Sequence, residues 1–329
     1  MKRIAAAILI STLSVSALVT PVAKASAPLI CMGYDTGGPG DSSFNDAAQA
    51  GLKAAAKKLQ FNLETTVTSG DAKDRIDRLT ALVKKDCTIV IAVGTGYAAT
   101  LKELSQQYPE TQFAILNDAT VDALNVTSIV FANVQGAYLA GFTAALASKT
   151  GKVAMVGYAS QKELFEKGFA PGAKAAKKSI VTAIKYISSS ASTATTQLLR
   201  SGHDVIYLTT TGSATEVFGA IVASNNASKK KNLSGIITVE PDQFLSVDAA
   251  TKKFVIATVV KRVDLALIDL LTKTLDGSFL YDEVDPALGV YGHRYGISDN
   301  SIEITLRLPA LIAKTTKVNS ASIAASKLN

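Results

Sequence analysis

The 329-residue sequence predicts an α/β fold of two Rossmann-like lobes, each a doubly wound parallel sheet, joined by a hinge of several strands. Three observations support this prediction. Strand-like and helix-like segments alternate along most of the chain. Continuous Val- and Ile-rich runs such as 87–94 suit parallel strands that helices cover on both faces. Since 48% of the residues are hydrophobic and 19% are charged, the chain can bury two cores of domain size.

The first series of segments begins near residue 27. Strands are expected where short apolar runs end at turn residues, and helices where apolar residues recur every three or four positions. The expected strands cover 27–35, 62–69, 88–94, 113–118 and 126–133, and the expected helices begin at Phe44, Asp74 and Tyr97. This βα order predicts the first parallel sheet.

A second series repeats the same order from Asn133. The expected strands cover 152–158, 183–189, 204–210 and 235–240, and the expected helices cover 136–149, about 162–178, 194–201 and 214–224. The helix near 136–147 is apolar nearly all round. Because about 12 residues are too few to span a bilayer, we expect this helix to be buried.

The last third of the chain is expected to pass between the lobes more than once. A strand at 254–262 and an amphipathic helix at 264–275 lead back to the first lobe, and 286–298 returns to the second. The predicted N-terminal lobe is therefore 28–133 plus 262–285, and the predicted C-terminal lobe is 134–261 plus 286–329. Hinge strands are expected near 132–136, 257–263 and 284–290, and several such crossings predict lobes that open and close.

Residues 1–27 have the three parts of a secretory signal peptide. A basic start at 2–3 precedes an apolar stretch over 4–19 and small residues up to position 27. We expect cleavage after Ala25 or Ala27, because the apolar stretch is short for a transmembrane anchor. The mature protein is therefore expected to be secreted across the cytoplasmic membrane and to be periplasmic or associated with the cell surface.

The charge of the chain argues against a nucleic-acid partner. The whole sequence has a formal charge of +7, and removal of the signal leaves 31 of the 34 basic side chains against 27 acidic ones, a charge of +4. This excess is too small to indicate nucleic-acid binding. The densest basic run, 229–231, lies in a polar stretch typical of a solvated loop.

Cys31 and Cys87 are the two cysteines of the chain, and each lies in or beside an expected strand of the first lobe. In an oxidising compartment they are candidates for a disulfide, and the alternative is a pair of buried thiols. Cys31 follows Pro28-Leu29-Ile30 instead of the small residues of a lipoprotein signal, so a lipid anchor is not indicated.

The turn between the first strand and the first helix is rich in glycine and carries two acids. In open α/β sheets ligands bind beyond the carboxyl ends of the strands, where loops and helix N-termini meet, so this turn is expected to line a cleft between the lobes. Ser43 and Asp46 have the spacing of a capping box, which predicts a helix start near Phe44. Asp41 is expected to support the turn or the helix end.

The sequence carries few signals of catalysis. It contains no G-x-G-x-x-G that opens a helix, no phosphate-binding G-x-x-x-x-G-K-[ST] and no G-x-S-x-G. Its two histidines, His203 and His293, are far apart and form no zinc motif or Ser-His-Asp set. We therefore expect neither a metal nor a cofactor.

Residues 35–45, DTGGPGDSSFN, resemble the D-x-G-G-x-x-D-x-S-F-N signature of the basic membrane protein (BMP) family of solute-binding proteins. Further resemblances to this family follow in the same order at 113–118, 125–157, 205–218 and 259–264. Together they cover residues 29 to about 293. The resemblance implies the two-lobed type I periplasmic binding protein fold and a receptor for nucleosides that feeds an ABC transporter.

The resemblance also implies roles for residues of the first lobe. Phe44 would stack on a nucleobase, while Asn45 and either Asn117 or Asp118 would read the edge of the base. The choice between Asn117 and Asp118 is open because the family's I-I-D is I-L-N-D here. Asp35 has two alternatives, direct contact with the ligand or support of the glycine turn.

The sugar contacts implied by the resemblance come from the second lobe. Glu240 would accept hydrogen bonds from the ribose hydroxyls, and Lys261 would fix that acid and donate to an oxygen. Because the family's V-D-S-D-Q is VEPDQ here, Asp242 is an alternative to Glu240. Gly212 would let the backbone approach the sugar, although Thr211 replaces the neighbouring glycine of the family.

Tyr207 stands where the family tends to have phenylalanine. It has two alternatives, a second stacking face for the base or a core position in its strand.

The function expected from this resemblance is capture of a nucleoside, with a purine favoured, and delivery to the permease of an ABC transporter by a monomeric binding protein. Two alternatives stay open. One is a receptor of the same fold for a sugar or a signalling ligand, and the other is an enzyme that cleaves nucleosides with carboxylates alone. Reversible closure of the lobes is the expected mechanism.

Overall fold

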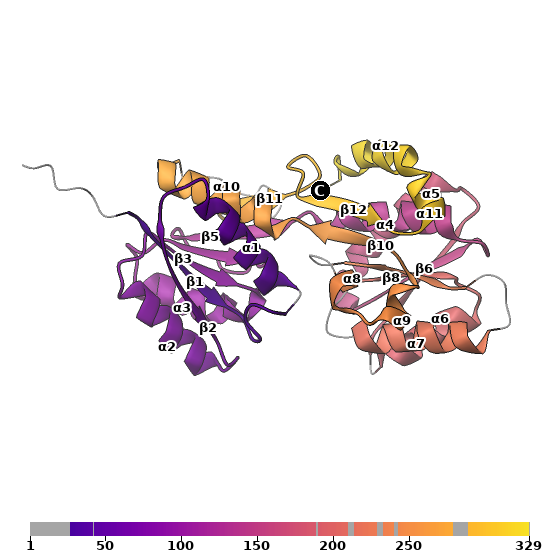
Figure 1. Ribbon diagram of the computed structural model, residues 1–329, viewed down its shortest axis with the longest axis horizontal. Helices are drawn as coiled ribbons and strands as arrows, with labels where there is room; N and C mark the ends of the chain where they lie inside the picture. The colour runs from indigo at the N-terminus through magenta and orange to yellow at the C-terminus, as the bar shows by residue number, and fades with distance from the viewer. Residues whose placement is uncertain are drawn as a thin grey trace, which may run out of the picture.

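The computed structural model describes residues 27–41, 43–188, 190–209, 214–228, 233–239, 243–278 and 289–328. Two α/β lobes lie side by side, and a narrower middle region joins them (Figure 1). Each lobe contains a sheet of six described strands, between helices on its two faces. The predicted fold class is confirmed.

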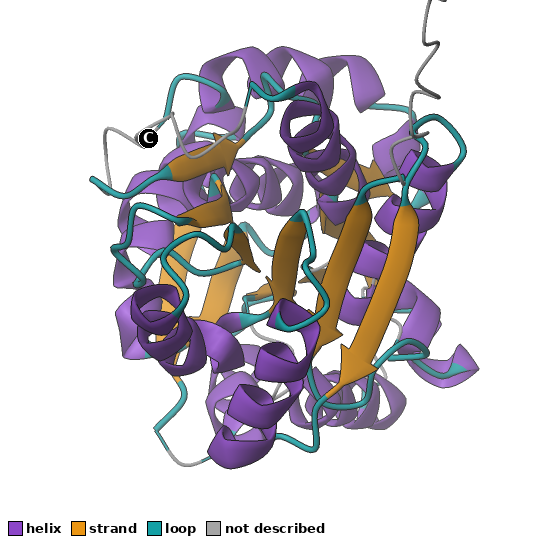
Figure 2. Cartoon of the chain, turned by 90° about the vertical axis from the view of Figure 1, so that its left-hand side faces the viewer, coloured by secondary structure: helices purple, strands orange, loops and turns teal. Residues whose placement is uncertain are grey.

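The first sheet has the strand order β11-β5-β4-β3-β1-β2, and its pairings are parallel. Its strands are β1 (Leu29–Tyr34), β2 (Asn62–Val67), β3 (Ile89–Val93), β4 (Phe113–Leu116), β5 (Val126–Phe131) and β11 (Gly292–Tyr295). The continuous apolar runs of β3 and β4 are fully buried, as their sequences predict. Figure 2 shows this lobe facing the viewer, with helices around the strands.

Among the described residues, two pairs of helices cover the first sheet. On one face lie α1 (Phe44–Ala56) and α10 (Val263–Asp276), and on the other lie α2 (Ala72–Val83) and α3 (Ala98–Gln107), which a short 3₁₀ turn, η1 (Thr95–Tyr97), precedes. The backbones of α1 and α10 approach closely at Gly51, where a Cβ atom would lie 3.0 Å from the Cα atom of Asp264. A helix more than 200 residues away in the sequence therefore holds α1 in place.

The second sheet has the order β12-β10-β9-β8-β6-β7, and only its pairing of β12 with β10 is antiparallel among those described. Its strands are β6 (Lys152–Gly157), β7 (Val181–Tyr186), β8 (Val205–Leu208), β9 (Gly235–Thr238), β10 (Val255–Lys261) and β12 (Ile302–Leu306). The edge strand β12 has no counterpart among the strands expected from the sequence.

The helices of the second lobe also lie on two sides. On one face lie α4 (Asn133–Ala147), the π-helix η3 (Leu164–Phe169) and α5 (Ala170–Ala176), and on the other lie α6 (Ala191–Arg200) and α7 (Ala214–Ala227). The other described helices are α12 (Thr315–Ala325), which packs on α4, and four of three or four residues, η2 (Ala159–Gln161), α8 (Gln243–Ser246), α9 (Ala249–Lys252) and α11 (Pro309–Ile312). The apolar α4 is buried between α5, α12 and the sheet, which confirms the expectation for 136–147.

The described chain passes from one sheet to the other at three places. These are β5 to α4, β10 to α10, and β11 to β12. The crossings are bonded to one another, because Ala132 N donates to Tyr295 O at 2.9 Å and Arg262 N donates to Ser301 O at 2.9 Å. The first two fall within or beside the expected hinge segments. The third described crossing lies at 296–301, and residues 284–288 of the expected segment 284–290 lie outside the described residues.

The assignment of all of 286–329 to the second lobe is wrong for β11. This strand pairs with β5 of the first sheet, and Gly292 allows that pairing because a Cβ atom there would lie 2.0 Å from Ser128 O. Tyr295 is buried against Phe131, and its hydroxyl donates to Asp269 of α10 at 2.8 Å. These contacts keep the chain in the first lobe for about ten residues longer than the sequence pattern suggests.

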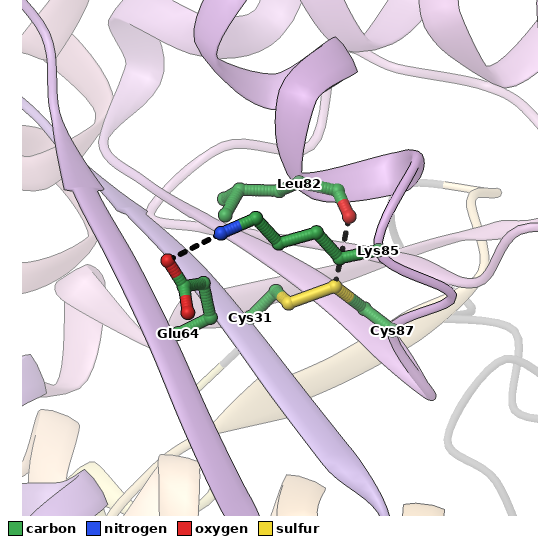
Figure 3. The surroundings of a disulfide bond; sticks show 5 residues. All are labelled: Cys31, Glu64, Leu82, Lys85 and Cys87. Carbon is green, nitrogen blue, oxygen red and sulfur yellow. Dashed lines mark hydrogen bonds and ion pairs between the residues drawn. A yellow bond between two sulfur atoms is a disulfide. The ribbon is translucent and has the colours of Figure 1, made fainter.

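The expected disulfide between Cys31 and Cys87 is present. Cys31 lies in β1 and Cys87 precedes β3, and because β1 and β3 are adjacent parallel strands the two Cα atoms are 5.9 Å apart. Figure 3 shows the bond at the start of both strands, with the ion pair of Lys85 and Glu64 beside it. The bond fixes the end of the sheet that lies opposite the carboxyl ends of its strands.

Replacing both cysteines by alanine should lower the free energy of unfolding by about 4 kcal/mol, because the bond closes a loop with a sequence separation of 56. Urea unfolding of the parent and the Cys31→Ala/Cys87→Ala variant measures the difference. Thiol titration of the unreduced, denatured parent should find no free thiol, and two free thiols would contradict the assignment.

Candidate functional site

The carboxyl ends of β1, β3 and β4 surround a pocket of about 260 Å³ in the first lobe. Parallel strands bring the loops that follow them to one edge of the sheet, and here these loops meet the first turn of α1. The described residues that line the pocket are Asp35, Thr36, Asp41, Phe44, Asn45, Val93, Gly94, Thr95 and Asn117. The pocket thus combines one aromatic ring with carboxylate, amide and hydroxyl groups.

Hydrogen bonds made by the side chains of Asp41 and Asn45 hold much of the β1–α1 turn. The Asp41 carboxylate accepts hydrogen bonds from Ser43 N at 2.7 Å, Asn45 N at 3.2 Å and Asp46 N at 3.2 Å. The buried Asn45 amide accepts from Asp35 N at 3.0 Å and donates to the backbone oxygens of Asp35 and Thr36. These bonds fix the first turn of α1 against the end of β1.

The helix begins at Phe44 as predicted, but the predicted capping box is wrong. Ser43 makes no side-chain cap, and the Asp46 carboxylate instead accepts from Gly40 N at 2.6 Å. Asp41 takes the capping position because Gly37, Gly38 and Gly40 all have positive φ and turn the chain back over the helix start. The expected structural role of Asp41 is confirmed.

Asp35 lies at the pocket wall in an ion pair with Arg75 of α2, at 2.8 Å. Arg75 also donates to Gly70 O and lies over the ring of the buried Tyr97, 5.5 Å from its centroid. Two glycines make room for this pair: a Cβ atom at Gly94 would lie 3.1 Å from the Asp35 carboxylate, and one at Gly96 would lie 2.7 Å from the Arg75 guanidinium. The pair orients the Asp35 carboxylate at the end of β1.

Phe44 lies half-buried at the start of α1, beside the pocket and above the core. The Lys261 ammonium, at the end of β10 in the second sheet, lies 5.6 Å from the centroid of the Phe44 ring. A cation at this distance is attracted to the face of the ring. Phe44 and Lys261 therefore bring the two lobes together beside the pocket.

A second cavity of about 810 Å³ lies between the lobes. Asp41 and Ser43 form its wall in the first lobe, and residues of α7 together with 247–251 form its wall in the second. Its volume falls within the ~300–1,000 Å³ usual for small-ligand sites. Because Asp41 lines both cavities, the smaller pocket and this interlobe chamber adjoin at the β1–α1 turn.

Asn117 and Asp118 take different positions. Asn117 has a φ of 66° at the end of β4 and lines the pocket. Asp118 is buried and accepts from the backbone and the hydroxyl of Thr120, at 2.7 and 2.6 Å. The structure therefore places Asn117, and not Asp118, among the pocket residues.

Tyr207 lies in the core and not in the cleft. Its side chain is 2% exposed and its ring stacks on Phe169 with the centroids 5.8 Å apart. Phe169 in turn stacks on Phe165 of the same π-helix. Of the two alternatives for Tyr207, the core position is therefore correct. The Tyr207 ring lies on the face of β8 that η3 covers.

Three of the sugar-binding candidates, Gly212, Glu240 and Asp242, lie outside the described residues. Within the described ranges, no group of three or more His, Cys, Asp or Glu side chains is arranged to hold a metal ion. The same part of the chain contains no helix long and apolar enough to cross a membrane.

Comparison with known proteins shows to which family the chain belongs. Residues 30–327 match the model of the Bmp family, described as ABC transporter substrate-binding protein PnrA-like. The chain belongs to this family. It is 30% identical over 260 residues to the ABC transporter nucleoside-binding protein BmpA of Lactococcus lactis, covering 74% of each chain. As a Bmp-family member, it is a substrate-binding protein of an ABC transporter and has a permease as partner.

Solved structures show the same fold at low identity. An ABC transporter solute-binding protein from Conexibacter woesei superposes with a TM-score of 0.68 at 19% identity, covering 92% of this chain and 98% of that one. A transcriptional activator of the comK gene from Bacillus halodurans gives a TM-score of 0.71 at 18% identity, with 91% and 98% covered. These likenesses support the two-lobed fold of this Bmp-family chain.

Arg75, Thr36 and Thr95 belong to the site but carry no recognisable motif in the sequence. The segment GTGYAAT at 94–100 gave an indirect signal for Arg75. Its two glycines leave the space that the Asp35 and Arg75 side chains occupy. Thr36 and Thr95 add two hydroxyl groups to the pocket of this Bmp-family protein. Neither threonine belongs to a motif that spacing alone reveals.

The free energy of unfolding should fall as the pH rises from about 10 to about 12. Burial, followed by a nearby carboxylate, raises the pKa of Tyr34 and of Tyr97 to about 12, whereas tyrosine in an unfolded chain loses its proton near 10. Since the unfolded state releases these protons first, stability present below pH 10 is lost as the pH approaches 12.

A Tyr97→Phe variant tests this pH dependence, because it keeps the ring and removes one titrating hydroxyl. Urea unfolding at pH 9 and pH 12 measures how far the free energy of unfolding falls between these two pH values. The fall in Tyr97→Phe should be smaller than that in the parent by on the order of 2 kcal/mol. Equal losses in the two proteins would show that the Tyr97 hydroxyl is not shielded by the fold.

Proposed function

We propose that this Bmp-family protein captures a nucleoside, preferentially a purine nucleoside, between its lobes and delivers it to its permease. The observation that carries the proposal is the place of Phe44, at the edge of the pocket and facing Lys261 of the other lobe. A flat aromatic ligand fits such a position because every nucleobase has a face that stacks on an aromatic ring.

The base-reading groups in this proposal are polar side chains that line the pocket. Asn117 offers an amide with both donor and acceptor, and Asp35 offers a carboxylate already oriented by Arg75. Asn45 has a different role, because its amide binds the backbone of Asp35 and Thr36. It positions the turn that carries Phe44, and this supports the ligand site indirectly.

The sugar-binding groups are proposed for the second lobe. Lys261 is buried at the end of β10, close to Phe44, where an ammonium can donate to a ribose oxygen or to a carboxylate that binds the ribose. Glu240, or Asp242 in its place, is the proposed carboxylate. A hydrogen bond to a charged group contributes about 1.5–3 kcal/mol, so these contacts should distinguish ribose from deoxyribose.

Lobe closure is the proposed mechanism of capture. The three crossings between the sheets are short and lie together, which suits a hinge, and the interlobe chamber of about 810 Å³ is the space that closure reduces. A ligand that contacts both lobes stabilises the closed form by its differential affinity for that form. The closed protein, acting as a monomer outside the cytoplasmic membrane, then presents the nucleoside to the permease.

The name of the Lactococcus lactis relative, a nucleoside-binding protein, agrees with this proposal. A panel of nucleosides, free bases and sugars, screened by thermal shift and followed by calorimetry, tests it. A ligand that binds only the folded state raises the melting temperature. Purine nucleosides should give the largest rise, ribonucleosides should bind more tightly than 2′-deoxynucleosides, and no free base should appear during incubation.

A rise in melting temperature with sugars alone would contradict the proposal and favour a sugar receptor of the same fold. Release of free base from the incubated nucleoside would instead favour the enzyme. Equal affinities for ribose and deoxyribose nucleosides would remove the role of Glu240 and Lys261 in binding the sugar.

The Phe44→Ala variant should bind purine nucleosides about tenfold to hundredfold more weakly, because base stacking contributes about 1–3 kcal/mol. Phe44→Tyr, which keeps the ring plane, is the matched control and should stay within a few-fold of the parent. Titration calorimetry measures all three proteins. Unchanged affinity in Phe44→Ala would contradict the stacking role.

A further inference from the structure

The β1–α1 turn has the architecture of an anion-binding site. In doubly wound folds, a glycine-rich turn after the first strand brings the N-terminus of the next helix to a phosphate group, which the free backbone N–H groups and the helix dipole stabilise. This chain has the same parts: Gly37, Gly38 and Gly40 with positive φ, followed by the 13-residue helix α1.

The place of the anion is taken by a side chain of the protein itself. One carboxylate oxygen of Asp41 accepts from Ser43 N and Asp46 N, and the other accepts from Asn45 N. These are the backbone donors at the start of α1 that a bound phosphate would need. The Asp41 carboxylate therefore both satisfies the donors and neutralises the positive end of the helix.

Asp41 also stands where the smaller pocket meets the interlobe chamber, since it lines both. A substituent that leaves the nucleoside toward the chamber passes close to this carboxylate. The chamber adds a second acid, Asp248, which caps α9 through Thr251 N at 2.7 Å. The described residues that line the chamber include no lysine or arginine.

We propose that Asp41 is a specificity-determining residue that excludes phosphorylated ligands by occupying the anion position at the start of α1. The proposal rests on the proposed nucleoside function and adds the selection of uncharged nucleosides over nucleoside monophosphates. A phosphate carries a charge of about −1.5 to −2 at neutral pH, so near Asp41 it meets a like charge instead of free N–H groups.

Titration calorimetry with adenosine, guanosine and their 5′-monophosphates tests the proposal in the parent and in Asp41→Asn. Asparagine still caps a helix but removes the charge. The parent should bind each monophosphate at least about a hundredfold more weakly than its nucleoside, and Asp41→Asn should reduce that ratio by about tenfold or more. Asp41→Ser, which caps with a smaller group, should reduce it further.

Asp46→Asn is the matched control. It removes a carboxylate from the same first turn of α1, but Asp46 is not among the described residues that line either cavity. In Asp46→Asn, the ratio of nucleoside affinity to monophosphate affinity should stay within about twofold of that of the parent. Thermal melting without ligand establishes that each variant is folded, and Asp41→Ser serves if Asp41→Asn does not fold.

The outcomes separate this proposal from the function on which it rests. A parent that binds nucleosides and monophosphates equally, or an Asp41→Asn ratio equal to that of the parent, overturns the role of Asp41 and leaves nucleoside binding intact. An equal change in Asp46→Asn overturns it as well, because the effect would then belong to the net charge of the turn. A parent that binds neither ligand overturns both proposals.

Discussion

The hydrogen bonds of Asp41 and Asn45 within the β1–α1 turn are the constraint on which the proposed site depends. Asn45 is 3% exposed, and its amide joins the end of β1 to the start of α1, while Asp41 satisfies the first backbone donors of the helix. A buried polar group that loses its partner costs about 1–3 kcal/mol, so the turn has one strongly preferred conformation. That conformation places Phe44 at the edge of the pocket and directs Asp35 toward Arg75.

The two lobes are joined unequally on their two sides. One hydrophobic cluster includes strands of both sheets together with α1, α4 and α10, whereas the clusters beneath α2 and α3 and beneath α6 and α7 belong to one lobe each. The crossings lie along the shared cluster, and the large cavity lies between Asp41 and α7, away from it. A molecule that is packed continuously on one side and hollow on the other is suited to bend about its crossings.

Much of the fold follows from local sequence. Alternation of apolar runs and amphipathic segments predicted the parallel strands and their helices. The positions of Cys31 and Cys87 in or beside strands of the first lobe made them candidates for the disulfide, which the structure contains. The start of α1 was also predictable, but its cap was not. Spacing favoured Ser43 and Asp46, whereas the positive φ of Gly37, Gly38 and Gly40 lets the turn bring Asp41 to the helix start. Local spacing does not contain that geometry.

The remaining differences come from contacts between distant segments. Arg75 reaches Asp35 across 40 positions, Tyr207 is covered by a π-helix, and β11 stays in the first sheet because Tyr295 packs on Phe131 and bonds Asp269. No periodicity records such pairings. The choice between Asn117 and Asp118 likewise depends on whether each side chain lines the pocket or bonds Thr120, which only three dimensions decide.

The central claim, a nucleobase stacked on residue 44 between the lobes, can be measured by fluorescence because the chain contains no tryptophan. A Phe44→Trp variant gives a single reporter at the site, and Leu63→Trp, on the exposed edge strand β2, gives a reporter away from it. Saturation with a purine nucleoside should quench the first reporter strongly and leave the second unchanged. Full binding by calorimetry without quenching at position 44 would contradict the claim.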